Sequence, residues 1–192
     1  LKRCGCQFIK FGFEASSDTV LKLMNKNASL EQNMAALKLV KDIGGIGMGL
    51  NFIWNNLGDN EDTLRKNVEL IKKYNTYYQC RTIRPVTPYP GSDLYYHLIK
   101  EGKIKGPADF FERFINSDLI LINLMDISDE KAYELLLEVN TDLILDHYNN
   151  TAGDLDEAQR LIQQFADLYS RKIINFRGSR HYNNDDKDNP KK

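Results

Sequence analysis

Polar side chains lie at the ends of apolar, strand-like segments, where they could hold a small molecule. Glu14 ends a segment that begins at Gln7, and a fixed carboxylate at that point can accept hydrogen bonds from amino or hydroxyl groups of a ligand. Asn51 and Asn55 lie in and just after the apolar run from Ile46 to Trp54, where each amide requires a polar partner. That partner is either a ligand or another group of the fold.

Serine and arginine side chains extend this set of candidate binding residues. Ser16 and Ser17 follow Glu14, and each could contact a ligand hydroxyl or cap the helix that begins there. Arg81 and Arg84 lie on a third strand-like segment, and their spacing of three predicts that they face opposite sides of it. A guanidinium can bind a ligand carboxylate or form an ion pair within the fold. Glu14 has structural alternatives as well, as a helix-cap acceptor or a salt-bridge partner.

The composition argues against several classes of partner. The 192 residues carry a formal net charge of -1, so no bulk attraction to nucleic acid is expected. No apolar run approaches the roughly 18 residues that cross a bilayer, so we expect no membrane insertion. Cys4, Cys6 and Cys80 form no disulfide framework, and their odd number fits a reducing compartment, which makes the protein's expected location cytoplasmic. The histidines are far apart in sequence, so no metal ligand is predicted.

The periodicity of apolar residues predicts strands that alternate with helices, the pattern of parallel βαβ units. Cap signals place helix starts at Ser17 or Asp18, at Ser29, and at Asp59 or Asn60. Strands are expected over Gln7–Glu14, Ile46–Trp54 and Tyr77–Val86, and further helices over Asp93–Glu101, Pro107–Ile115, from Ser128 onward, and over Leu155–Ile174.

Three sequence motifs accompany the three predicted strands. The first comprises residues 1–6 and 11–17 with the later Met-Asn-Lys of residues 24–26, the second residues 52–63, and the third residues 84–92. In this order and spacing they resemble motifs of the radical S-adenosylmethionine (SAM) superfamily. The likeness is to its cobalamin-associated group, which is related to the anaerobic magnesium-protoporphyrin IX monomethyl ester cyclase, and it extends to about residue 150.

The resemblance implies an α/β fold that is the C-terminal half of a partial (β/α)6 radical SAM barrel, with three parallel strands and their helices in residues 1–105. It implies a helical C-terminal extension over residues 106–176, and the polar composition of residues 177–192 predicts a disordered tail. Glu14 would end the fourth strand of the barrel and contact the SAM amino group or ribose. The residues expected to bind SAM are Glu14, Ser16, Ser17, Asn51, Asn55, Arg81 and Arg84.

The family also uses a [4Fe-4S] cluster to cleave SAM reductively, and the cluster cysteines follow the pattern Cys-x3-Cys-x2-Cys. That pattern is absent here, and Cys4 and Cys6, whose spacing is wrong for it, are expected to be buried small residues. Ala15 and Ser16 replace the family's Ser-Gly, and residues 55–57 (Asn-Asn-Leu) replace its Gly-Leu-Pro.

The sequence is therefore interpreted as part of a radical SAM enzyme that is inactive alone and acts on a small-molecule substrate. The missing N-terminal half of the barrel would be its partner, and cobalamin is possible in the full-length protein. The alternative is a cluster-free barrel relative that acts as a binding or assembly module.

Overall fold

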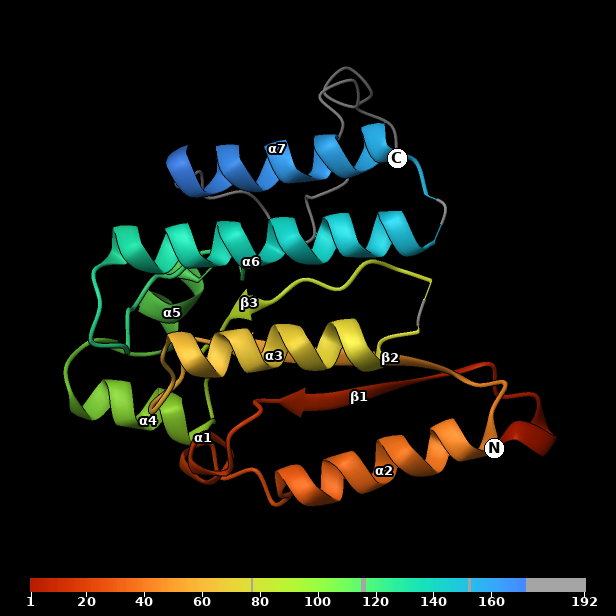
Figure 1. The fold of residues 1–192 in the computed structure, drawn as a ribbon. Helices are drawn as coiled ribbons and strands as arrows, with labels where there is room; N and C mark the ends of the chain where they lie inside the picture. The colour runs from red at the N-terminus through yellow and green to blue at the C-terminus, as the bar shows by residue number, and fades with distance from the viewer. Residues whose placement is uncertain (77, 115–116, 152, 172–192) are drawn as a thin grey trace, which may run out of the picture.

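A parallel sheet of three strands, ordered β1-β2-β3, lies at the centre of the computed structural model, which describes residues 1–76, 78–114, 117–151 and 153–171 (Figure 1). The strands are β1 (Phe8–Glu14), β2 (Gly47–Trp54) and β3 (Arg84–Pro85). Both strand pairs are parallel, which confirms the predicted α/β class and its three parallel strands. The predicted tail, residues 177–192, lies outside the described residues.

Helices connect the strands and continue after them. The first two follow β1, α3 joins β2 to β3, and the others come after the sheet. Their bounds are α1 (Asp18–Leu23), α2 (Leu30–Ile43), α3 (Glu61–Tyr74), α4 (Asp93–Lys100), α5 (Pro107–Arg113), α6 (Asp129–Asn150) and α7 (Leu155–Arg171), with a short 3-10 turn at Lys2–Cys4.

The predicted helix starts are confirmed by side-chain caps. The Ser17 hydroxyl accepts a hydrogen bond from the backbone N–H of Val20 at the start of α1. Ser29 and Gln32 form a reciprocal capping box on α2, and Asn60 and Thr63 form one on α3. Each cap satisfies N–H groups that the first helical turn leaves without an intrahelical acceptor.

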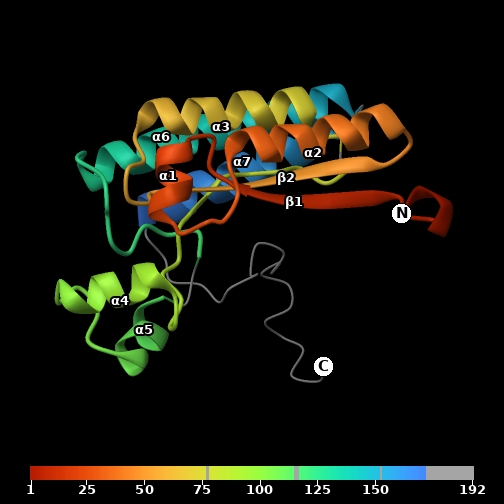
Figure 2. The same cartoon turned by 90° about the horizontal axis from the view of Figure 1, so that it is seen from below.

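One face of the sheet packs against helices α2, α3 and α6. Figure 2 shows these helices on the same side of β1 and β2. Alternate residues of β2 point into this layer, and they are almost completely buried: Met48, Leu50, Phe52 and Trp54. Because successive strand side chains alternate between faces, the residues between them lie on the opposite face.

The third strand is much shorter than the predicted segment Tyr77–Val86. Tyr77 lies outside the described residues, and only Arg84 and Pro85 are paired with β2. Farther back along β2, the ladder positions are taken by residues just after α3. The N–H of Met48 donates to the Thr76 hydroxyl at 2.9 Å. A third strand at this edge would need the Met48 N–H for its own pairing. Regular pairing with β2 therefore begins only at Ile53, opposite Arg84.

A buried asparagine holds the segment before β3. Asn140 of α6 accepts a 2.8 Å hydrogen bond from the Ile83 N–H and donates to the Ile83 carbonyl at 3.0 Å. The same side-chain nitrogen lies 3.2 Å from the Tyr169 hydroxyl of α7. The amide thus gives Ile83 the two bonds that another strand would provide.

The helices after the sheet belong to two packing groups. Residues of α6 and α7 share the main hydrophobic core with the sheet, whereas α4 and α5 pack around a separate cluster of Tyr95, Leu98, Ile104 and Phe110. The boundary after residue 105 between the barrel half and the helical extension, which the sequence suggests, remains a prediction.

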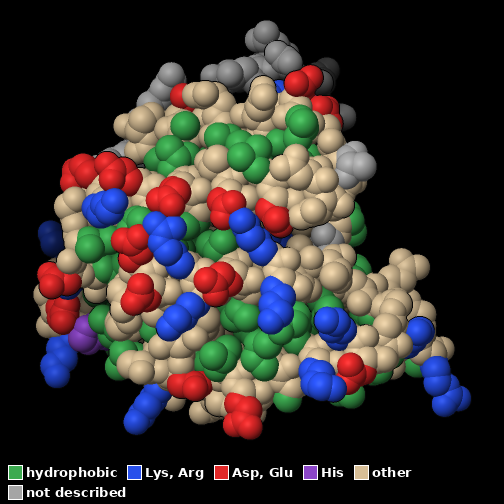
Figure 3. Space-filling model, in the orientation of Figure 1, with side chains coloured by type: hydrophobic (Ala, Val, Ile, Leu, Met, Phe, Trp, Pro, Cys, Tyr) green, Lys and Arg blue, Asp and Glu red, His purple; other side chains and the backbone are tan. Residues whose placement is uncertain are grey.

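Charged side chains of both signs are interspersed over the face formed by α3 and α6 (Figure 3). Arg65 of α3 pairs with Glu138 of α6, and Lys72 pairs with Asp142. Within the part of the chain that the structure describes, no helix combines the length and apolarity needed to cross a membrane.

Replacement of Asn140 by alanine should destabilise the fold strongly. Asn140 is fully buried, and its loss leaves the Ile83 N–H and carbonyl without their partner. Buried polar groups without partners cost about 1–3 kcal/mol each, so we expect unfolding free energy to fall by about 2–4 kcal/mol in urea titrations. The matched control is Asn149→Ala, an exposed asparagine of the same helix. Equal effects of the two substitutions would contradict the bridging role of Asn140.

Candidate functional site

The face of the sheet opposite α2 and α3 carries several of the sequence-predicted residues; we call it the open face. Gly12 of β1 pairs with Asn51 of β2, and Ile53 pairs with Arg84 of β3. Partners in a parallel pair point to the same side, and Asn51 and Ile53 alternate with the buried residues of β2. Asn51, Ile53 and Arg84 therefore share the open face with the bare backbone of Gly12.

The Glu14 carboxylate lies on this face as well. Its backbone has φ of 66°, and the Ala15 N–H donates to the Phe13 carbonyl at 2.9 Å, which closes a three-residue turn centred on Glu14. The side chain folds back over Gly12, because a Cβ at Gly12 would lie only 2.5 Å from the Glu14 Oε1. Glycine at position 12 thus makes room for the carboxylate.

Lys26 fixes the position of the Glu14 carboxylate. Its ammonium lies 3.2 Å from Oε1, and both side chains are partly exposed. The left-handed backbone of Glu14 costs about 1–2 kcal/mol relative to an ordinary conformation. A non-glycine residue held in this way at the end of a strand, with its carboxylate partly open to solvent, is characteristic of a binding site. Lys26 was not among the predicted site residues, although it belongs to the first motif.

Glu14 and Asn55 lie at the same end of the sheet. Glu14 pairs with Phe52 in the parallel ladder, and Asn55 follows β2 directly. Asn55 is nevertheless buried, and its amide donates to the Ile122 carbonyl at 2.8 Å and accepts from the Leu124 N–H at 2.9 Å. These contacts show a structural role that fastens the loop before α6 to the sheet.

The two serines also make structural hydrogen bonds. The Ser16 N–H donates to the Asn67 side chain at 2.9 Å, and its hydroxyl donates to the Thr63 carbonyl at 3.3 Å. Ser17 caps α1. Ser16 therefore ties the segment after β1 to α3. As SAM ligands, Ser16, Ser17 and Asn55 remain predictions.

The two arginines do not face opposite sides as their spacing suggested. Both line one cavity, because the segment from Tyr78 to Ile83 lacks the regular pairing that produces strand alternation. The Arg81 guanidinium lies over the backbone of Gly49, where a Cβ would be 3.1 Å from Nη2. Arg84 pairs with Asp118 at 3.1 Å, the ion-pair alternative considered for it.

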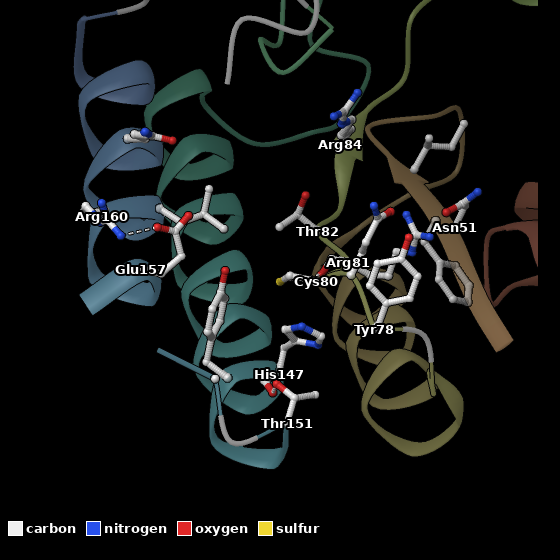
Figure 4. A pocket seen from close by; sticks show the side chains of 17 residues that line it. Asn51, Tyr78, Cys80, Arg81, Thr82, Arg84, His147, Thr151, Glu157 and Arg160 are labelled. Atoms are coloured by element: carbon white, nitrogen blue, oxygen red, sulfur yellow. Dashed lines mark hydrogen bonds and ion pairs between the residues drawn. The ribbon is translucent and has the colours of Figure 1, made fainter. Parts of the chain in front are cut away.

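The cavity that these arginines line has a volume of about 1110 Å³. It lies between the open face and the ends of α6 and α7 (Figure 4). We call it the hairpin cavity, after the helical hairpin that these two consecutive helices form. Asn51 and Arg81 lie on its sheet side, whereas Glu157 and Arg160 of α7 lie across from them. Sequence reasoning missed the α6 and α7 residues, because nothing in their spacing links them to the strands.

A smaller cavity of about 370 Å³ lies at the carboxyl end of the sheet, lined by the end of α1, the loop after β2 and the segment after β3; we call it the edge cavity. Asn56 lines it with only 3% of its surface exposed, and its Nδ2 has no hydrogen-bond partner among the described residues. Ile53 lines both cavities, so they meet at this side chain.

Asp59 organises the loop that leads from β2 to α3. Its carboxylate accepts hydrogen bonds from the Asn56 N–H at 2.9 Å and from the Thr63 hydroxyl at 2.8 Å. Burial raises the pKa of Asp59 to about 6, against the opposing effect of these two hydrogen bonds. The loop that supports the edge cavity therefore contains a carboxyl group that gains a proton in mildly acidic solution.

The described residues do not fit a [4Fe-4S] cluster. Cys4 is exposed and Cys6 and Cys80 are half-buried, so the expectation that Cys4 and Cys6 are buried is wrong. Within the described ranges, no group of three His, Cys, Asp or Glu side chains could hold a metal ion. The cluster would need thiolates from other residues.

Comparison with known proteins found two curated relatives that match about half of this chain. An uncharacterized methyltransferase of Pyrococcus horikoshii is 29% identical over 99 residues, which cover 52% of this chain and 21% of the relative. The anaerobic magnesium-protoporphyrin IX monomethyl ester cyclase of Rubrivivax gelatinosus is 29% identical over 97 residues, covering 50% of this chain and 17% of the cyclase. The chain thus spans about a fifth of the length of either relative. No family model matches the sequence.

Titration of Asp59 should show a midpoint near pH 6 in carboxyl carbon NMR spectra. An unfolded aspartate titrates near pH 3.9, so between about pH 4 and 6 the folded chain holds a proton that the unfolded chain has lost. The stability from this group is therefore complete below pH 4 and is lost as the pH rises through 6. Relative to Asp59→Asn, the wild-type chain should lose on the order of 2 kcal/mol across this interval. A midpoint below 4.5 would contradict the effect of burial.

Proposed function

We propose that this chain is the later half of a radical SAM enzyme barrel and that its open face binds SAM next to the substrate. The observation that carries the proposal is the Glu14 carboxylate, which is held over Gly12 by a left-handed turn and by Lys26. The two relatives, named a methyltransferase and a cyclase, support an enzyme of this kind.

In this proposal Glu14 accepts hydrogen bonds from the ribose hydroxyls or the amino group of SAM. A carboxylate suits this task because it is an acceptor at both oxygens, and the ion pair with Lys26 holds it in place. Lys26 stabilises the anion without covering it, since a quarter of the Glu14 side chain remains exposed. Asn51, exposed on the neighbouring strand, contributes a second polar group on the same face.

The edge cavity would hold the adenine base. Its lining is mostly apolar, with Ile53 on the sheet side and Val86 after β3, and a flat base is bound favourably between such side chains. The buried Nδ2 of Asn56 lacks a hydrogen-bond partner within the described part of the chain, so a ring nitrogen of the base could supply one. The cavity and Glu14 lie at the same carboxyl end of the sheet, where parallel α/β folds bind ligands.

Bound SAM would supply radical chemistry on the substrate, as it does in the radical SAM family. The protein residues described here bind and orient SAM and limit access of water. The cluster thiolates, and cobalamin if the enzyme uses it, would be bound by polypeptide other than these residues. The same geometry would serve a cluster-free module that binds SAM. Reconstitution of the iron–sulfur cluster therefore distinguishes a radical SAM enzyme from such a module.

Anaerobic reconstitution of the 192-residue chain with iron and sulfide should give no [4Fe-4S] absorbance. Its cysteines, Cys4, Cys6 and Cys80, lack the motif spacing of the family. The natural full-length protein, treated in the same way, should show a broad visible absorption band if it is a radical SAM enzyme. A cluster bound by the chain alone would overturn our assignment of its cysteines, and its absence from the full-length protein would favour the binding module.

Replacement of Glu14 by alanine should weaken SAM binding more than it weakens folding. Loss of one charge-assisted hydrogen bond costs about 1.5–3 kcal/mol, or roughly tenfold or more in affinity. The side chain is partly exposed and its backbone is strained, so the cost to stability should stay below about 1 kcal/mol. Glu14→Gly should not lower the melting temperature at all, because glycine adopts positive φ without strain.

The measurements are calorimetric titration of the full-length protein with SAM and thermal unfolding of the same samples. Glu69→Ala, the same substitution at an exposed position of α3, is the matched control and should leave both quantities unchanged. Unchanged SAM affinity combined with a sharply lowered melting temperature for Glu14→Ala would make Glu14 a structural residue.

A further inference from the structure

We propose that the hairpin cavity binds a neutral ring-containing ligand and that His147 recognises it by accepting a hydrogen bond from an O–H or N–H group of that ligand. His147 lies in the last turn of α6 and lines the cavity. The site is distinct from the edge cavity proposed for adenine. Identification of the ligand as the substrate rests on the proposed function, whereas the binding site itself does not.

The backbone at His147 is held in place by the end of α6. Its carbonyl accepts hydrogen bonds from the Thr151 hydroxyl at 2.7 Å and from the Thr151 N–H at 3.0 Å. Helices α6 and α7 pack along each other and share the main core with β2. The imidazole therefore extends from a packed wall of the cavity, toward the segment that carries Tyr78 and Cys80 (Figure 4).

The hydrogen bonding of the His147 ring leaves it an acceptor. A neutral imidazole has one N–H and one nitrogen with a free lone pair. The N–H of His147 donates to the backbone carbonyl of Tyr78, which fixes the tautomer. The ring forms no further hydrogen bond within the described part of the chain. Because the side chain is only half-buried, a ligand in the cavity can donate to the second nitrogen.

The surroundings of His147 keep it neutral near pH 7. Burial lowers the pKa of His147 below the usual 6.5, and the positive charge of Arg81 acts in the same direction. The hydrogen bond to Tyr78 and the negative charge of Asp146 raise the pKa but do not cancel the effect of burial. The ring is thus an acceptor in neutral solution and becomes a donor at both nitrogens only in acid.

The other charged side chains of the cavity favour a neutral ligand. Glu157 pairs with Arg160 on α7, and Arg84 of β3 pairs with Asp118. The Arg81 guanidinium lies against the sheet, with its Nε and Nη2 buried. The cavity therefore presents paired charges and neutral polar groups to a ligand. Its remaining titratable groups are those of Tyr78, Cys80 and Tyr148.

The apolar part of the lining indicates that the ligand contains a ring. Tyr78, Tyr148, Leu161 and Ile53 contribute aromatic and aliphatic surface, and the volume of about 1110 Å³ is ample for a ring with substituents. The Tyr148 ring stands at 86° to the His147 imidazole, with their centroids 5.4 Å apart. The acceptor nitrogen thus belongs to a ring pair that offers aromatic surface beside it. The ligand class that fits is a phenol or another ring with an O–H or N–H donor.

The test uses the 192-residue chain and two probes, para-cresol and its methyl ether, which has the same ring but no donor. Dissociation constants are measured by NMR titration, with the carbon-bound ring proton of His147 as reporter. This signal is assigned by its loss in His147→Gln. At about pH 7 we expect saturable binding of para-cresol and about threefold to tenfold weaker binding of the ether, the effect of one hydrogen bond.

Acid should abolish the preference for para-cresol. Protonation turns the acceptor nitrogen of His147 into a donor, so para-cresol should bind more weakly as the pH falls from about 7 to about 5, whereas the ether should not. The phenol itself does not titrate in this range. By linkage, saturating para-cresol should lower the midpoint of the His147 titration. An unchanged midpoint would contradict contact with this nitrogen.

Substitutions separate recognition by His147 from a structural role. His147→Phe keeps a ring but removes the acceptor, so it should bind the two probes equally. His147→Gln keeps an acceptor that cannot titrate, so its preference for para-cresol should persist from about pH 7 to about pH 5. His97→Phe, the matched control in α4, should behave as the wild type, because His97 lines the edge cavity instead.

Three results would overturn the proposal. Para-cresol does not saturate, or His147→Phe retains the preference at an unchanged melting temperature, or His97→Phe loses the preference, which would place the probe in the edge cavity. SAM affinity of the full-length protein, measured separately, reports on the proposed function alone.

Discussion

The whole structure depends on the requirement that buried backbone groups be hydrogen-bonded, and asparagine side chains meet it where strands do not. The amide of Asn140 takes the place of a neighbouring strand at Ile83, and the amide of Asn55 bridges the backbone at Ile122 and Leu124. Asn75 accepts from the Leu50 N–H on the free edge of β2. A side-chain amide has the same donor and acceptor as a peptide group, so it can end a sheet without leaving a buried group unpaired.

Because asparagine side chains hydrogen-bond backbone groups in place of neighbouring strands, the sheet can be short and still carry a site. The helices cover one face, so the apolar residues of β2 are buried there while the open face keeps its polar groups. On that face, Gly12 and Gly49 lie beneath the two charged side chains, Glu14 and Arg81. The absence of a Cβ at each position lets a carboxylate and a guanidinium lie close to the sheet backbone. The two charges then occupy different parts of one surface, beside two cavities that meet at Ile53.

Much of the local structure could be predicted from sequence, because caps and periodicity act over a few residues. The capping box at Ser29 and the strand ending at Glu14 are where the pattern placed them, and Asn60 is one of the two caps predicted for α3. The third strand was predicted too long, since an alternating segment cannot reveal that Thr76 already occupies the edge of β2. Sequence also could not separate Asn51, which stays exposed on the open face, from Asn55, which is buried beneath a loop almost 70 residues away.

The sequence by itself determined the order of strands and helices, their caps, the resemblance to radical SAM enzymes and the lack of the cluster motif. These properties depend on neighbouring residues or on short motifs. Only the tertiary structure decided where the polar residues lie: Glu14 over Gly12, Arg81 over Gly49, and Asn56 at the edge cavity. It also decided that α6 and α7 form a wall of the larger cavity. The reason is physical, since burial and cavity shape arise from contacts between segments far apart in the chain, which no local pattern records.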